Sequence, residues 1–253
     1  AQYPTAQIKE ITEDYATKAI NYPVIHTTEL VLTDNETLPI KTFQSFEVDP
    51  LAAITATLSK LEEQDEEMWI QVIVKPISDD WHKRSSAMVK KIKEKAAGGG
   101  GVGIGALLGA FAKPPEYDAK SGGAGEVSER DKSRITAIQE KSTKLGYQVK
   151  IRVIYTGNNE GTARLRMQSM VGTFKQFNTT NLNGFQSKSP SFDRARVQDY
   201  RDRSFDDKGF ILNIEELASL YHLPHTTVET PNIVWANSKT AEPPSNLPTQ
   251  SKF

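Results

Sequence analysis

Cysteine is absent from this chain of 253 residues, so neither a disulfide framework nor a thiolate zinc site is possible. The composition is compatible with a reducing compartment. No run of about 18 apolar residues offers a membrane-spanning helix, and no basic segment followed by an apolar one suggests a signal peptide. The formal net charge is only -1, so any attraction to nucleic acid has to come from a local basic cluster.

The first part of the chain, residues 1–95, predicts a strand–helix–strand unit followed by a second helix. β-branched and aromatic residues at 29–32 and 38–46, separated by a turn triplet, predict a hairpin. Asp49 and Pro50 predict a helix start, and the apolar run 68–74 predicts a strand buried on both faces. The next helix, over residues 80–95, has a basic outer face with Lys83, Lys90, Lys91 and Lys93.

Glycine and proline interrupt this pattern at residues 96–127, which have too few side chains to offset chain entropy. We predict a flexible, mobile insertion there. It contains a small apolar island, residues 102–111, that is too short and too rich in glycine to cross a membrane. Two interpretations stay open for the island: the tip of a loop, or a segment that transiently contacts a membrane or a partner.

The second part, residues 128–227, predicts a helix over 128–144, a strand, and a turn at 157–159 that leads into another helix. A short strand at 210–212 and a further helix follow, and Asn213 and Glu216 predict a capping box at the start of that helix. The first strand alternates apolar residues with Gln148, Lys150 and Arg152, which predicts a half-exposed strand with its basic residues on one face. Both halves therefore predict an α+β fold in which helices pack on a mixed sheet. The two split βαβ (ferredoxin-like) halves are separated by the insertion, and residues 228–253 form an extended, proline-rich linker.

No motif for catalysis or for a cofactor stands out. The glycine-rich run lacks the Gly-Lys-Ser/Thr of a phosphate loop and follows a helix, and the dinucleotide spacing is not met either. His222 and His225 have Pro224 between them, which argues against a shared metal ion. His82 and Asp79 with the serines at 85–86 have no nucleophile turn, so a catalytic triad is rejected. We expect no catalytic centre, cofactor or metal.

A basic and aromatic segment near the end of the second half is the one candidate for contact with nucleic acid. Arginine side chains hold phosphates and aromatic rings stack on bases, whereas interspersed aspartates favour a solvated loop with internal ion pairs. Both interpretations stay open. Five basic residues face three aspartates here; the candidate nucleic-acid-binding residues are Lys188, Arg194, Arg196, Arg201 and Arg203.

Several stretches resemble a known family of proteins. They are residues 1–4, 69–85, 172–186 (GTFKQFNTTNLNGFQ), 209–224 (GFILNIEELASLYHLP) and 228–233. Together they are similar to the region upstream of the motor domain in HerA/FtsK-like ATPases, which are related to type IV secretion coupling (conjugative DNA transfer) proteins of small-genome uncultivated bacteria. The block 209–224 is the most specific, because a strand–helix segment of this kind commonly precedes the ATPase core.

The resemblance implies a non-catalytic accessory or assembly domain of a membrane-associated, DNA-translocating ATPase. The implied partners are the ATPase domain of the parent chain, further copies in a ring formed through the parent, and DNA. The implied location is the cytoplasm, at the inner face of the inner membrane. The alternative is a free-standing α+β protein-binding module with no motor partner, which uses the apolar island as its docking tip.

Overall fold

The computed structural model describes residues 10–16, 22–62, 66–96, 127–188, 194–206 and 209–223, and of residues 194 and 195 only the backbone. Five strands form one sheet in these residues: β1 (Val24–Leu32), β2 (Glu67–Pro76), β3 (Gly146–Gly157), β4 (Phe185–Ser187) and β5 (Phe210–Asn213). Their order is β2-β3-β1-β4, and β5 pairs with the first residues of β3.

Every strand pairing in the described residues is antiparallel. Because β3 lies between β1 and β2 and opposes both, β1 and β2 run parallel with a strand of the other half between them. This is the split βαβ arrangement, so the predicted α+β fold is confirmed. The two halves thereby contribute to one sheet.

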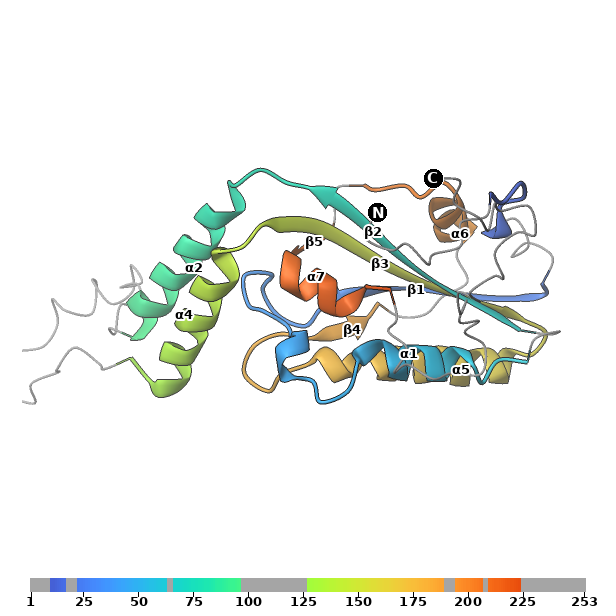
Figure 1. The fold of residues 1–253 in the computed structure, drawn as a ribbon, viewed down its shortest axis with the longest axis horizontal. Coiled ribbons are helices and arrows are strands. Elements are labelled where there is room, and N and C mark those ends of the chain that lie inside the picture. The colour runs from blue at the N-terminus through green and yellow to red at the C-terminus, as the bar shows by residue number, and fades with distance from the viewer. Residues whose placement is uncertain are drawn as a thin grey trace, which may run out of the picture.

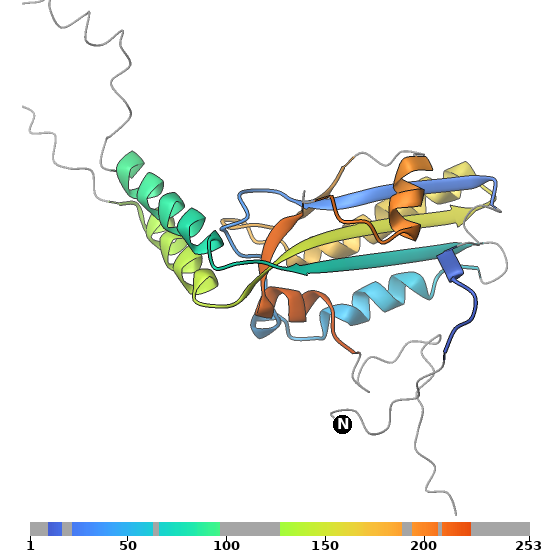
Figure 2. The same cartoon turned by 90° about the horizontal axis from the view of Figure 1, so that it is seen from above.

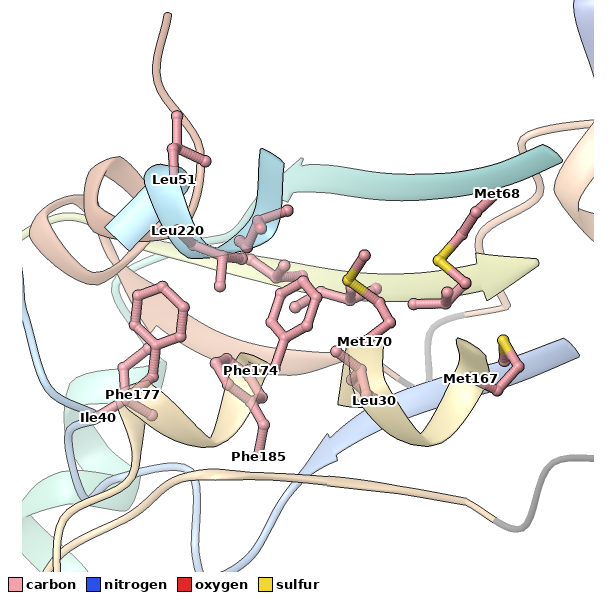
Figure 3. Close-up of a cluster of buried hydrophobic side chains, with 14 of the residues drawn as sticks. Leu30, Ile40, Leu51, Met68, Met167, Met170, Phe174, Phe177, Phe185 and Leu220 are labelled. Carbon is pink, nitrogen blue, oxygen red and sulfur yellow. The ribbon is translucent and has the colours of Figure 1, made fainter. Parts of the chain in front are cut away.

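Two helices cover one face of the sheet: α1 (Pro50–Leu58) and α5 (Glu160–Phe174) (Figure 1). Both begin at the residues that the sequence indicates. Asp49 accepts a hydrogen bond from the amide of Leu51 at 2.8 Å, and Asn159 accepts one from Thr162 at 3.0 Å. Figure 3 shows the apolar layer between these helices and the sheet, in which Leu30, Met68, Met167, Met170, Phe174, Phe177 and Phe185 belong to one buried cluster.

The opposite face of the sheet is covered by the segment 10–16 and by α6 (Arg194–Arg201). A second, smaller apolar cluster lies here, formed by Ala16, Ile154 and Tyr200 with Trp69 packed against it. The ring of Tyr15 meets Trp69 edge-on at 5.4 Å between ring centroids. The sheet is therefore buried between two layers over much of its width.

The connection between β2 and β3 is a helical arm. It is formed by α2 (Trp81–Ala96) and α4 (Glu129–Ser142), which pack side by side and project away from the sheet (Figures 1 and 2). Residues 97–126 join the distal ends of these helices and lie outside the described residues. The predicted mobile insertion, apart from its end residues 96 and 127, and its apolar island at 102–111 therefore lie outside the described residues, and so does the predicted linker 228–253.

The predicted hairpin between residues 29–32 and 38–46 is wrong. The part of β1 that the hairpin would use is already paired, because β1 pairs with β3 through residues 24–30 and with β4 through residues 30–32. The segment 38–46 instead contains a short 3-10 turn, η2 (Phe43–Ser45). The amide of Ile40 donates to Glu216 at 2.8 Å and that of Phe43 donates to Ser219 at 2.8 Å. Side chains of helix α7 (Ile214–Leu220) therefore accept the hydrogen bonds that a neighbouring strand would have accepted.

Two predictions about strand burial are also wrong. β3 is not half-exposed: Lys150 and Arg152 share one face as predicted, but they are 5% and 6% exposed because α6 and the loop after it cover that face. β2 is not buried on both faces, since it lies at the end of the sheet and Val74 is 39% exposed. An apolar run alone does not distinguish a central strand from an edge strand that faces a groove.

Candidate functional site

The predicted basic segment lies on α6, over the face of the sheet opposite to α1 and α5. Arg196 and Arg201 are half-buried, and the backbone of Arg194 begins the helix while its side chain is outside the described residues. The guanidinium of Arg203 lies 3.0 Å from Asp14, and the ammonium of Lys188 lies 2.8 Å from Glu29.

A small pocket of about 210 Å³ lies beneath α6 and reaches Arg196. Its charged walls come from β1, β3, α6 and the loop after α6. Lys150 forms ion pairs with Glu29, at 3.0 Å, and with Asp206. Arg152 donates to the carbonyls of Asp199 and Ser204 at 3.1 and 2.7 Å. The buried cations of β3 therefore fasten α6 and its following loop to the sheet.

Glu29 forms ion pairs with two lysines at this pocket, Lys150 and Lys188. Burial by itself would raise the pKa of its carboxyl, but hydrogen bonds and charge attraction from Lys188 and Lys150 outweigh burial and hold the pKa below its usual value. On the other side of α6, burial raises the pKa of Tyr200, with the hydroxyl of Tyr15 at 3.4 Å as a second cause. Tyr200 is therefore neutral at physiological pH.

The structure thus brings together Arg196, Arg201 and Arg203 on one short segment, and Lys188 lies beside Glu29, which lines the pocket beneath α6. Carboxylates already engage Lys188 and Arg203, so a phosphate would have to compete with Glu29 and Asp14 for them. Binding of nucleic acid by this segment stays a prediction. The buried cations Lys150 and Arg152, which sequence reasoning assigned to an exposed face, were missed as structural residues.

A second feature joins the arm to the end of the fold. Lys141 of α4 and Glu216 of α7 form an ion pair at 3.0 Å in which both side chains have 0% exposure. The ammonium of Lys141 also donates to the carbonyl of Ile211 at 3.0 Å, and Glu216 accepts from the amides of Ile40 and Asn213 at 2.8 Å each. One buried pair therefore connects the arm, β5, α7 and the segment after β1.

The block 209–224, on which the family resemblance depends most, has the predicted local structure where it is described. β5 is followed by α7, and Asn213 and Glu216 form the predicted capping box. The role of Lys141 was missed. A signal exists in the sequence, because Lys141 follows Ile135 and Ile138 at three-residue spacing and so lies on the apolar side of α4.

A third feature is an apolar groove of about 800 Å³ along the outer edge of β2. The floor is the strand from Ile70 to Val74. One wall is formed by α1 and α7, and the other side carries Tyr15 and Arg203. The apolar residues contributed by the helical wall are Leu51, Ile54, Ile214, Leu217, Leu220 and Tyr221. Ile214 and Tyr221 are 45% and 64% exposed, so the groove opens to solvent in the described part of the chain.

A polar pocket of about 600 Å³ lies where β2 begins and β3 ends, next to the first turns of α5. Arg166 of α5 pairs there with Glu66 at 3.0 Å. Burial and the neighbouring Glu66 carboxylate raise the pKa of Tyr155 to about 12. Nearby, His26 lies 3.0 Å from Glu160 in the first turn of α5. These pairs attach the start of α5 to the strands.

The histidines and serines considered in the sequence do not form a metal site or a catalytic triad in the described residues. His222 lies 3.0 Å from Asp49, and His225 is outside the described residues. His82 lies 3.7 Å from Asp79 at the start of α2, while Ser85 is buried beneath it. In the portion of the chain with described coordinates, no three histidine, aspartate or glutamate side chains converge to hold a metal ion. No described helix has the length and apolar character to cross a membrane.

Fold and sites together define an α+β domain of the split βαβ class with a helical arm between the edge strand β2 and the central strand β3. The chain belongs to the family described as "Domain of unknown function (DUF8128)", whose model matches residues 1–236. No curated protein and no solved structure matches the chain.

Proposed function

We propose that this chain is a non-catalytic assembly and positioning domain of a DNA-translocating ATPase of the type IV secretion and conjugation kind. The parent protein acts at the cytoplasmic face of the inner membrane. Its motor domain follows this domain, and the copies assemble into a ring through the parent. The resemblance of residues 209–224 and the other matched stretches to the region upstream of HerA/FtsK-like motors supports this proposal.

The observation that carries the positioning role is the buried pair between Lys141 and Glu216. Lys141 belongs to the projecting arm, and Glu216 belongs to the helix from which the chain continues toward the proposed motor. Because neither side chain contacts solvent, water cannot replace one partner if the two separate, and separation leaves a buried unpaired charge. A force on the arm is therefore transmitted to the element that leads to the motor.

The first test is the coding sequence that follows Phe253. We expect a phosphate loop, G-x-x-x-x-G-K-[ST], within the next few dozen residues. A stop codon directly after Phe253 would remove the motor from the proposal.

The second test measures coupling in the parent protein. A flexible five-residue Gly-Ser segment inserted after Asn237 loosens the connection between domain and motor. We expect DNA-stimulated ATP hydrolysis to fall while basal hydrolysis remains, because the motor is no longer held in place. The control has the same segment inserted after Gly100, in the glycine-rich insertion. Equal activity of the two variants would contradict positioning.

DNA contact by α6 has its own test. The triple substitution Arg196→Gln, Arg201→Gln and Arg203→Gln removes three positive charges from the candidate segment. If this segment holds phosphates, the slope of log K against log salt concentration becomes shallower by about 0.9 for each lost contact on duplex DNA. An unchanged slope removes these arginines from DNA binding and leaves assembly as the role of the domain.

The alternative function is a free-standing protein-binding module, and the shape of the arm favours it. Figure 1 shows α2 and α4 projecting from the sheet, and the insertion with residues 102–111 joins their distal ends. Deleting residues 98–125 abolishes capture of a partner in this case. In the assembly proposal the same deletion leaves fold and ring formation intact.

A further inference from the structure

The outer edge of β2 has no neighbouring strand among the described residues. β2 ends the strand order, and its pairing with β3 over residues 67–76 uses only one of its edges. Every second residue of an edge strand directs its amide and carbonyl away from the sheet. An apolar edge of this length invites pairing with another strand, and native proteins usually cover or interrupt it.

Apolar side chains flank this edge on both faces of the sheet, and Gln71 and Arg203 make the face toward Tyr15 the more polar one. Ile70 and Val72 face α1 and α7, while Gln71 and Ile73 face Tyr15 and Arg203. The groove thus surrounds the edge of β2 on both faces of the sheet. A strand with apolar residues on both of its faces would fill it.

The last described helix, α7, ends inside this groove. Leu217, Leu220 and Tyr221 of the last helix line the helical wall. His222 contacts Asp49 at 3.0 Å, which places the end of α7 at the start of α1. Because α1 and β2 are joined by a short connection and run in opposite directions, the end of α7 lies beside the end of β2 near Val74.

The continuing sequence has the composition of a strand. Residues 232–236 read Asn-Ile-Val-Trp-Ala, with three adjacent β-branched or aromatic residues. The preceding Pro231 is acceptable just before an edge strand. From Asn237 onward the sequence is polar and rich in proline. The family model also ends at residue 236, so the shared domain extends beyond the last described residue, Leu223, and includes this segment.

We propose that residues 232–236 of the same chain bind the groove as an additional strand that pairs antiparallel with β2. Ile233 and Trp235 face the helical wall, and Val234 faces the side of Tyr15. The connection 224–232 can span up to about 30 Å, whereas residues 70–74 of β2 occupy only about 17 Å, so the segment reaches the whole groove. Part of the predicted linker thereby belongs to the fold, whether or not a motor domain follows.

Disulfide scanning tests the pairing in the full chain, which contains no natural cysteine. Val72→Cys is combined in turn with a single cysteine at each position from 232 to 236. We expect disulfides within one chain at 233 or 235 and none at 234, because alternate residues of a strand share a face and a disulfide needs Cα atoms within about 7 Å. Peptide mapping identifies the bond.

Each other outcome overturns the proposal. Val72→Cys with Ser245→Cys, in the polar tail, gives the background, and cross-linking at 233 and 235 no higher than this background excludes a docked strand. Disulfide-linked dimers would show that a second copy fills the groove. Stronger cross-linking of Val72→Cys to Thr5→Cys would assign the groove to the N-terminal segment.

Hydrogen exchange provides a second measurement without cysteine. In the full chain, Ile233→Asp places a charge at the buried face of the proposed strand, and Ser238→Asp adds the same charge just outside it. We expect amides of β2 between Met68 and Lys75 to exchange about tenfold faster in Ile233→Asp than in Ser238→Asp. Equal exchange in the two variants would refute the pairing.

Discussion

Replacing Lys141 with methionine leaves the carboxylate of Glu216 buried without its cationic partner. Methionine keeps the unbranched stem of lysine, so the apolar packing of α4 changes little. The ion pair at 3.0 Å and the hydrogen bond to the carbonyl of Ile211 at 3.0 Å are lost. Glu216 retains its bonds to the amides of Ile40 and Asn213, which partly stabilise the remaining charge.

The expected loss follows from this environment. Removing one partner of a buried pair typically costs about 3–5 kcal/mol. We expect the lower end of that range, about 3 kcal/mol, because two amides still solvate Glu216. With a urea dependence of about 2 kcal/mol per molar for a small protein, the midpoint of unfolding should fall by about 1.5 M. Adding Glu216→Gln should recover part of the loss, since no uncompensated charge then stays buried.

The matched control is Lys132→Met on the same helix. Lys132 pairs with Glu129 at 2.8 Å, but its side chain is 45% exposed. A solvent-exposed pair between residues three or four apart contributes about 0.5 kcal/mol or less. The measurement is the urea midpoint of unfolding of each variant, monitored by circular dichroism. Equal midpoints for Lys141→Met and Lys132→Met would refute the claim that the buried pair anchors the arm.

Three further substitutions test other parts of the structure by urea unfolding. Gly146→Ala places a Cβ atom 2.6 Å from the indole of Trp81, so we expect a loss of about 1–3 kcal/mol from overpacking at the base of the arm. Glu29→Gln should destabilise the protein above pH 4.5, and the difference from wild type should disappear as the pH falls through the lowered pKa of Glu29. Asn213→Ala removes the buried cap of α7 and should cost about 1–2 kcal/mol, part of which Asn213→Ser restores.

These substitutions have their own controls. Gly172 of α5 has no heavy atom within 4 Å of an added Cβ, so Gly172→Ala should stabilise the helix by about 0.5–1 kcal/mol. Stabilisation by Gly146→Ala would mean that Trp81 does not pack there. For Glu29 the sign is fixed because its folded pKa is depressed: the contribution is complete above the unfolded value and is lost in acid. A pH-independent difference would contradict the ion-pair account.

Local signals in the sequence predicted the elements of the fold well. The cap Asp49, the predicted helix start at Ser128 and the turn at 157–159 mark helix starts that the structure shows, and the capping box of α7 was predicted in full. These signals depend on residues within one helical turn of each other. The split βαβ order was predictable because helix and strand patterns repeat in both halves.

Tertiary partners decided the features that the sequence misassigned. The segment 38–46 has the composition of a strand, yet its amides are taken by Glu216 and Ser219, which lie far along the chain. Lys150 and Arg152 alternate with apolar residues as on a solvated face, but α6 and its loop supply the carboxylate and carbonyl groups that allow their burial. No local pattern encodes such partners. The β2 groove was missed for the same reason, because its walls come from four separate parts of the chain: α1, α7 and the segments of Tyr15 and Arg203.

The geometry of the arm makes the buried pair more than a local contact. α2 has 16 residues, so the arm extends about 24 Å from the sheet. At its base, Trp81 packs against Gly146 so closely that no side chain fits between them. Rotation of the arm about this base moves Lys141, and Glu216 must then follow or lose its partner at a cost of about 3–5 kcal/mol. Small displacements are therefore shared between the arm and α7, and under the proposed positioning role a load on the arm reaches this last described helix.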